Sequence, residues 1–288
     1  MTNDTTPKGG STMHGDFLDL LGRLTVRRHR ASPAAGGERE TMPDDRLRTI
    51  VFECLVEGIG DDRVDSLLHV IGWDDDDVCM SVAGRPSEER HAFESRVKAR
   101  LLDAGARSVL AGLRDGWTVI LVGARDARAA EAACLSAAAE FGADDFVCLG
   151  DVGTSARGAA ASVCGTMSAL RAAPGVPDLP HVIHASDVLP ERALLGDATA
   201  RRQLYDAVYQ ALRSGGTCDS ALPTIDAFLR SGGSLDATAK RLRVHPNTVR
   251  YRLKRVASTT GWDATNPREA YVLRTALAIG RMDDAKRG

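Results

Sequence analysis

The sequence predicts an α+β protein in which a ferredoxin-like βαββαβ domain is followed by an all-α helix-turn-helix domain. Residues 78–153 follow the order strand, helix, two strands, helix, strand. Residues 219–288 contain four apolar-striped segments separated by glycine, proline and capping residues. This last segment holds 13 Lys and Arg against 7 Asp and Glu, a net charge of +6, whereas the rest of the chain carries −8. An acidic body with a basic C-terminal module indicates one partner-binding domain.

The composition of the 288 residues is that of an ordinary globular protein with room for two cores. Six cysteines are scattered without a CxxC pair, which favours reduced, buried thiols over disulfides or a zinc site. The first residues lack the apolar segment of a signal peptide, and no apolar run approaches the ~20 residues of a bilayer span. We therefore expect a cytoplasmic protein with no membrane partner.

Residues 1–42 are rich in Gly, Ser, Thr, Pro and Arg and are expected to form a disordered tail with one weak helix at 16–26. Residues 43–173 form the next predicted domain, which begins with a helical lead-in. Apolar residues at helical spacing predict helices over 46–58 and 61–73, with Gly58 and Gly60 as the break. The run VCMSVAG (78–84) predicts a strand, and residues 87–106 predict an amphipathic helix.

The next element, SVLAGLRDGWTVILVGA (108–124), predicts two strands joined at Asp115-Gly116, because Asp-Gly between apolar runs is a strong hairpin signal. A helix over 126–142, a strand over 145–153 and an alanine-rich helix over 155–173 complete the order. Residues 174–218 are expected to be a linker with a bridging helix. Its first part, 174–190, holds four of the eleven prolines, and the helix is expected over 191–212.

The C-terminal domain, residues 219–288, is divided into four helices by its own stop and start signals. The first helix spans 219–230, is expected to bury Leu222, Ile225, Phe228 and Leu229, and ends at Gly232-Gly233. Ser234 is placed to cap a second helix that buries Leu235, Ala239 and Leu242. The third helix begins at Pro246, repeats the same spacing in Val249, Leu253 and Val256, and closes at Gly261. Asn266, Pro267 and Glu269 form a cap for the fourth.

Two helices joined by the short turn 243–245, the second longer and basic, predict a helix-turn-helix. Seven Lys or Arg and no acid lie between positions 240 and 255. If the apolar stripe of helix 246–260 faces the core, the opposite face can meet phosphates and base edges of double-stranded DNA. Asn247 could pair with adenine and Arg250 with guanine. The complete candidate DNA-binding set is Lys240, Arg243, His245, Asn247, Thr248, Arg250, Tyr251, Arg252, Lys254, Arg255 and Ser258.

The segment HPNTVRYRLKRV and the longer stretch around it strongly resemble the C-terminal helix-turn-helix of the PucR/CdaR family of bacterial transcriptional regulators. The linker DVLPERALLGDATARRQLYDAVYQAL looks most like the FasR-type branch, which regulates fatty-acid-synthase genes in actinobacteria. The resemblance covers residues 180–281 closely and 43–180 only in element order. It implies a sequence-specific DNA-binding regulator, a homodimer or higher oligomer, a GGDEF-like domain upstream, fatty acid biosynthesis genes as targets and an unidentified small-molecule effector.

Catalysis by a nucleotidyl-cyclase-type site requires carboxylates on the first strand and at the central hairpin to hold Mg²⁺. Strand 78–84 has no acid and the hairpin offers Asp115 alone, so we expect a degenerate GGDEF-like domain and no enzyme activity. The acidic run 74–77 is read as a solvated loop, and His181 with His184 lacks a third metal ligand. We expect no catalytic residue, metal or cofactor. The alternative is a ligand-sensing or protein-binding module whose GGDEF-like domain retains nucleotide or small-molecule binding.

Overall fold

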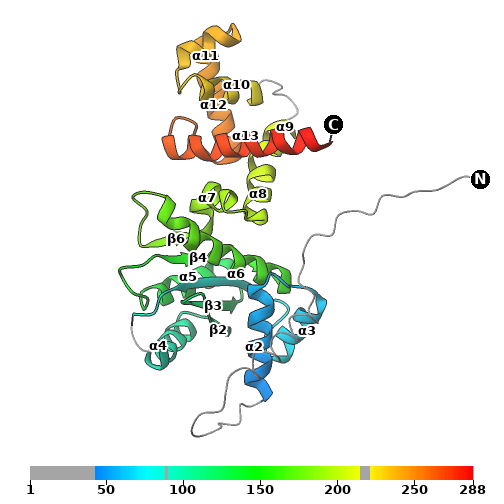
Figure 1. The fold of residues 1–288 in the computed structure, drawn as a ribbon, viewed down its shortest axis with the longest axis vertical. Helices are drawn as coiled ribbons and strands as arrows, with labels where there is room; N and C mark the ends of the chain where they lie inside the picture. Colours follow the sequence, from blue (N-terminus) through cyan, green and yellow to red (C-terminus); the bar gives the residue numbers. More distant parts are fainter. Residues whose placement is uncertain (1–42, 88–89, 215–220, 288) are drawn as a thin grey trace, which may run out of the picture. The chain divides into compact units, whose positions relative to one another are not determined.

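A computed structural model describes residues 43–87, 90–214 and 221–287 (Figure 1). The chain divides into two compact units, Met1–Thr166 and Met167–Gly288. The tail expected over residues 1–42, its weak helix and Cys218 lie outside the described residues. In the part of the chain that is described, no helix combines the length and the hydropathy needed to cross a membrane.

The first unit begins with the two predicted helices, α2 (Pro43–Val56) and α3 (Asp62–Val70). Asp61 caps α3 by accepting hydrogen bonds from the backbone N–H groups of Arg63 and Val64 at 3.1 and 3.3 Å. Helix α2 packs on β2 (Ser108–Arg114), where a Cβ added at Gly112 would lie 2.4 Å from the Phe52 ring. That glycine is therefore required for the close contact between helix and sheet.

Within the first unit the sheet has the strand order β2-β3-β1-β4, and each of these neighbouring pairs is antiparallel. Its other strands are β1 (Val78–Gly84), β3 (Trp117–Ala124), β4 (Val147–Leu149) and the two-residue β5 (Gly153–Thr154), which also pairs with β1. In the register, Met80 faces Val122 and Leu110 faces Leu121. The helices are α4 (Arg90–Asp103), α5 (Ala127–Ala138) and α6 (Ser155–Ala172). The predicted βαββαβ order is confirmed.

The hairpin between β2 and β3 has the backbone that its sequence predicts. Asp115 and Gly116 both have positive φ, 52° and 84°, as a type I′ turn requires. The strand expected over 145–153 is instead two short pieces, β4 and β5. Between them the backbone at Gly150 passes so close to the sheet and α6 that an added Cβ would lie 2.4 Å from Ser81 Oγ and 2.5 Å from Ser162 Oγ.

The linker region is more folded than its proline content suggests. It contains a 3-10 turn, η1 (Ala173–Gly175), strand β6 (Val182–His184), a second 3-10 turn, η2 (Ala185–Val188), and α7 (Leu189–Leu194). The single helix expected over 191–212 is wrong. The chain turns at Gly196, where φ is 91°, and restarts as α8 (Ala198–Leu204), a π-helical turn η3 (Tyr205–Gln210) and α9 (Ala211–Ser214).

A buried ion pair between Arg192 and Asp197 stabilises the turn between α7 and α8. Asp197 caps α8 by accepting from the N–H groups of Thr199 and Ala200 at 2.9 and 3.1 Å. The fully buried Arg192 donates from Nε to Asp197 Oδ2 at 2.9 Å and from Nη1 to the Ala185 carbonyl, also at 2.9 Å. A buried guanidinium is tolerated only with such partners, so these contacts determine where α7 ends and α8 begins.

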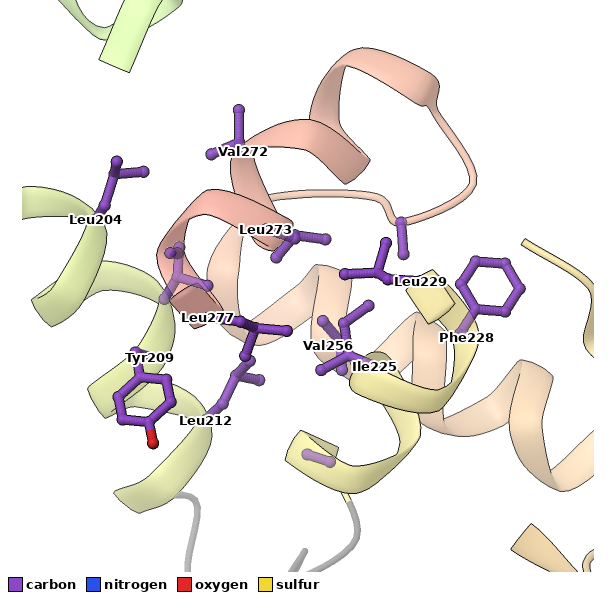
Figure 2. Close-up of a cluster of buried hydrophobic side chains, with 14 of the residues drawn as sticks. Leu204, Tyr209, Leu212, Ile225, Phe228, Leu229, Val256, Val272, Leu273 and Leu277 are labelled. Atoms are coloured by element: carbon purple, nitrogen blue, oxygen red, sulfur yellow. The ribbon is translucent and has the colours of Figure 1, made fainter. Parts of the chain in front are cut away.

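The C-terminal helices are α10 (Ala221–Arg230), α11 (Leu235–Leu242), α12 (Pro246–Thr260) and α13 (Pro267–Arg287). Their apolar faces meet in one core, in which Figure 2 shows Ile225, Val256 and Leu277 among the converging side chains. Helix α13 crosses the π-helical turn at Gly280, where an added Cβ would lie 2.1 Å from Tyr209 Cγ. The Tyr209 hydroxyl donates to Asp284 Oδ2 at 2.6 Å, and this bond raises the pKa of the phenol.

Candidate nucleic-acid interface

The turn between α11 and α12 is built from local backbone chemistry. Ser234 caps α11 through a 3.2 Å hydrogen bond from the N–H of Ala237. At the other end Arg243 adopts the left-handed conformation, with φ 54° and ψ 45°. The N–H of Val244 then donates back to the Ala239 carbonyl at 3.0 Å, and this hydrogen bond ends the helix. The left-handed position at a helix C-terminus is usually occupied by glycine. The turn itself was predicted, but the left-handed arginine was not.

Helix α12 begins and ends at the predicted residues. His245 is the N-cap, and its Nδ1 accepts a hydrogen bond from the N–H of Asn247 at 3.2 Å. Pro246 occupies the first helical position, where its missing N–H leaves no bond unmade. Gly261 ends the helix in the left-handed conformation with φ 80°. These signals fix the phase of α12 and therefore which side chains face outward.

The inner face of α12 is the predicted stripe. Val249, Leu253 and Val256 are 0%, 6% and 1% exposed. They pack in the core shared with α10 and α13, where Figure 2 shows Val256 among the labelled side chains. Burying three such side chains stabilises the helix by roughly 5 to 9 kcal/mol before entropy is counted. In contrast, Leu222, Leu235 and Leu242, expected in the core, are only half-buried.

The outer face carries the polar and basic candidates. Tyr251 is 65% exposed. The nearest acids along the chain are Asp236 and Asp263, so the sequence between them contributes only positive formal charge. Of the eleven candidate residues, eight are exposed (Lys240, Arg243, His245, Asn247, Arg250, Tyr251, Lys254 and Ser258) and three are half-buried (Thr248, Arg252 and Arg255).

The two residues expected to contact bases are bonded to each other. Arg250 Nη1 donates to Asn247 Oδ1 at 2.8 Å, one turn along the exposed face of α12. The pair holds both side chains against the helix surface and satisfies one polar atom of each. A ligand that hydrogen-bonds to both the Asn247 amide and the Arg250 guanidinium must therefore break the bond between them.

Arg252 has a different environment from its neighbours. Its Nη1 donates to Thr224 Oγ1 at 3.3 Å, and Thr224 is completely buried on α10. This bond ties α12 to α10 from the flank of the basic face. Sequence reasoning missed Thr224, although a threonine inside the apolar stripe of the first helix was a signal that a polar partner would be needed.

The hairpin aspartate and the acidic run belong to the first unit. Asp115 is a hairpin residue, as its sequence context predicts. In the acidic run, residues 74–76 are exposed as expected, but Asp77 is buried and pairs with Arg107 at 3.0 Å. The solvated-loop interpretation is therefore wrong for Asp77. Among the described residues, no group of three His, Cys, Asp or Glu side chains is placed to hold a metal ion.

Two family descriptions match the chain. The PucR C-terminal helix-turn-helix domain matches residues 221–279, and the GGDEF-like domain matches residues 57–172. The first match contains α10 to α12 and most of α13, and the second contains the βαββαβ sheet with its helices.

Comparisons with individual proteins agree with these matches. An uncharacterized protein of Mycobacterium tuberculosis is 34% identical over 248 residues, which is 83% of this chain and 59% of the relative, so the chain spans about three fifths of that relative's length. The purine catabolism regulatory protein of Bacillus subtilis is 35% identical over 102 residues, 35% of this chain and 19% of that protein. The crystal structure of a regulator of polyketide synthase expression from Bifidobacterium adolescentis superposes with a TM-score of 0.80 and 40% identity, covering 94% of this chain and 99% of that one.

Proposed function

We propose that this chain, which belongs to the PucR/CdaR family of transcriptional regulators, acts by binding promoter DNA through the outer face of α12. One observation carries the proposal. A helix anchored by three buried side chains presents an exposed face that carries Arg250 and Lys254, no acidic residue, and the Asn247 amide near its N-terminus. A helix-turn-helix of this kind reads the major groove with the first turns of its second helix.

The exposed residues divide by the chemistry they offer. Asn247 has the amide that pairs bidentately with adenine, and Arg250 has the guanidinium that pairs with guanine. Binding exchanges their mutual 2.8 Å hydrogen bond for contacts to bases. Lys240, Arg243 and Lys254 then contact phosphates, which position the helix without reading sequence. The exposed Tyr251 ring, with His245, Thr248, Arg255 and Ser258, completes the contact surface.

Arg252 is assigned a positioning role within the same surface. Its bond to the buried Thr224 holds α12 at a defined place on α10, so its removal is expected to shift the helix as well as to remove a charge. This distinguishes it from Lys254, which is exposed and whose loss removes charge alone.

One reading helix per chain recognises only a few base pairs, so the chain is expected to act as a homodimer or a higher oligomer. Two copies related by a twofold axis would read half-sites about 34 Å apart. The resemblance to the FasR-type branch points to fatty acid biosynthesis genes. The structural neighbour is described as a regulator of polyketide synthase expression, so promoters of both gene classes are candidate targets.

The test is capture of genomic DNA by the full-length chain, followed by sequencing of the recovered fragments. The double variant Asn247→Ala/Arg250→Ala is compared with Thr199→Ala/Arg202→Ala, a matched change on the exposed surface of α8. We expect the wild type and the α8 variant to enrich the same promoters, and the α12 variant to lose them with an unchanged circular dichroism spectrum. Enrichment that survives the α12 substitutions refutes the assignment. Enrichment without fatty acid or polyketide genes refutes only the proposed targets.

A further inference from the structure

The first unit contains a cavity with a volume of about 290 Å³, near the lower end of the range for small-ligand sites. It lies between α3, the acidic loop that follows it, the start of β1 and the start of α6. The cavity is remote in sequence from the hairpin at Asp115, where a nucleotidyl-cyclase-type site would lie.

Asp77 lies in the lining of this cavity, and its side chain is only 1% exposed. One carboxylate oxygen, Oδ1, accepts from Arg107 Nη1 at 3.0 Å. The other, Oδ2, is buried and has no hydrogen-bond partner in the structure. Burying a carboxylate oxygen without a hydrogen bond destabilises the folded state by several kcal/mol, so a hydrogen-bond donor next to Asp77 Oδ2 would be stabilising.

The inner walls of the cavity are apolar. Leu68 and Trp73 are 5% and 8% exposed, and Cys79 is 4% exposed. Burial raises the pKa of the Cys79 thiol to about 12, so the thiol is neutral, and it donates to the Gly153 carbonyl at 3.3 Å. The cavity therefore has an apolar wall, which includes Leu68 and the Trp73 indole, next to the buried Asp77 carboxylate.

The rim adds three more carboxylates, those of Asp65, Asp74 and Asp75, together with His69. No Lys or Arg belongs to the described lining. Asp65 uses Oδ1 to accept the N–H of Ala156 at 2.7 Å, which ties the rim to the start of α6. The Asp residues of the lining therefore outnumber its cations even though Arg107 pairs with Asp77, and this favours a bound cation over a phosphate or a carboxylate.

We propose that this cavity binds a small organic ammonium compound, whose N–H donates to Asp77 Oδ2 while its hydrocarbon part lies against Leu68 and Trp73. A divalent metal fits less well, because no three His, Cys, Asp or Glu side chains among the described residues are placed to hold one. An ammonium group needs no such shell, gains from an aromatic neighbour and brings the missing donor. The inference does not depend on the proposed role of α12.

The test is isothermal titration of the full-length chain with a fixed panel of putrescine, agmatine, phenethylamine and tyramine. Phenethyl alcohol and magnesium chloride serve as the neutral and metal controls. We expect at least one amine to bind, with both controls silent. Asp77→Asn should weaken that amine by about tenfold or more, since a hydrogen bond to a charged group is lost.

Asp76→Asn is the matched control, because Asp76 is exposed in the same loop and is not part of the lining. It is expected to leave affinity within about twofold at fixed salt. Should Asp77→Asn fail to fold, the exposed rim variant Asp74→Asn/Asp75→Asn provides the same comparison and is expected to weaken binding. The proposal is overturned if no amine binds, if phenethyl alcohol binds as well as phenethylamine, if magnesium binds instead, or if Asp76→Asn weakens binding as much as the lining variants.

Discussion

The salt dependence of DNA affinity measures how many cations of the helix-turn-helix meet phosphates. Besides Arg250, which is assigned to a base, four Lys or Arg side chains between positions 240 and 254 are exposed: Lys240, Arg241, Arg243 and Lys254. If all four neutralise phosphates, log K should fall against log salt with a slope of about −3.6 for each bound chain. Raising salt from 50 to 200 mM would then weaken binding by about 150-fold.

Removing two of these charges tests the count. Lys240→Gln/Lys254→Gln should reduce the slope to about −1.8, so that the same change in salt weakens binding only about 12-fold. The ratio of the two slopes, about 0.5, is the same for a monomer and for a dimer that places two α12 helices on DNA. Both side chains are exposed, so neither substitution opens the core.

Fluorescence anisotropy of a labelled duplex from the captured promoter, titrated at several KCl concentrations, gives both slopes. Arg202→Gln on α8, whose side chain is 84% exposed, is the control and should leave the slope unchanged. A wild-type affinity that does not change with salt concentration would contradict the predicted phosphate contacts. So would a double variant with the wild-type slope, or a control that lowers the slope as much as the double variant does.

Three further predictions concern the packing of each unit. Gly280→Ala should lower the free energy of unfolding by about 1 to 3 kcal/mol in urea titrations, because the added Cβ would overlap the Tyr209 ring, and an unchanged midpoint would contradict this packing. Arg192→Met should cost about 3 to 5 kcal/mol by the same assay, since it leaves Asp197 half-satisfied in a buried site; no loss would mean that the pair is dispensable. The Cys79 thiol, with its pKa raised to about 12 by burial, should react slowly with iodoacetamide at pH 8 in the folded chain and rapidly in urea, as followed by mass spectrometry of its peptide.

Local signals predicted local structure well. The Asp115-Gly116 turn, the Ser234 cap and the Pro246 start each depend on one or two residues whose backbone preference is strong. The βαββαβ order along the chain was predictable because each strand and helix has its own periodicity, whereas the pairing order of the strands is known only from the structure. The stripe of Val249, Leu253 and Val256 was buried as predicted, because three apolar positions at helical spacing have one way to face a core.

Features that depend on tertiary partners were not predictable in the same way. The break at Gly196 rests on the Arg192–Asp197 pair, and an arginine in an apparently amphipathic helix gives no sign that it will be buried. The bond from Arg252 to Thr224 joins residues 28 positions apart. Asp77 sits last in an acidic run that looks solvated, and its burial follows from the start of β1 at the next residue.

The most direct test of the central claim identifies what the outer face of α12 touches. Tyr251→p-benzoylphenylalanine places a photo-cross-linker on that face, at a side chain that is 65% exposed. Irradiation of the full-length chain with its captured promoter duplex should give a protein–DNA adduct, whereas the same probe at Leu135, 47% exposed on α5, should not. A Tyr251 probe that reacts only with protein, or a duplex that is bound and yet yields no adduct at this position, would contradict the account.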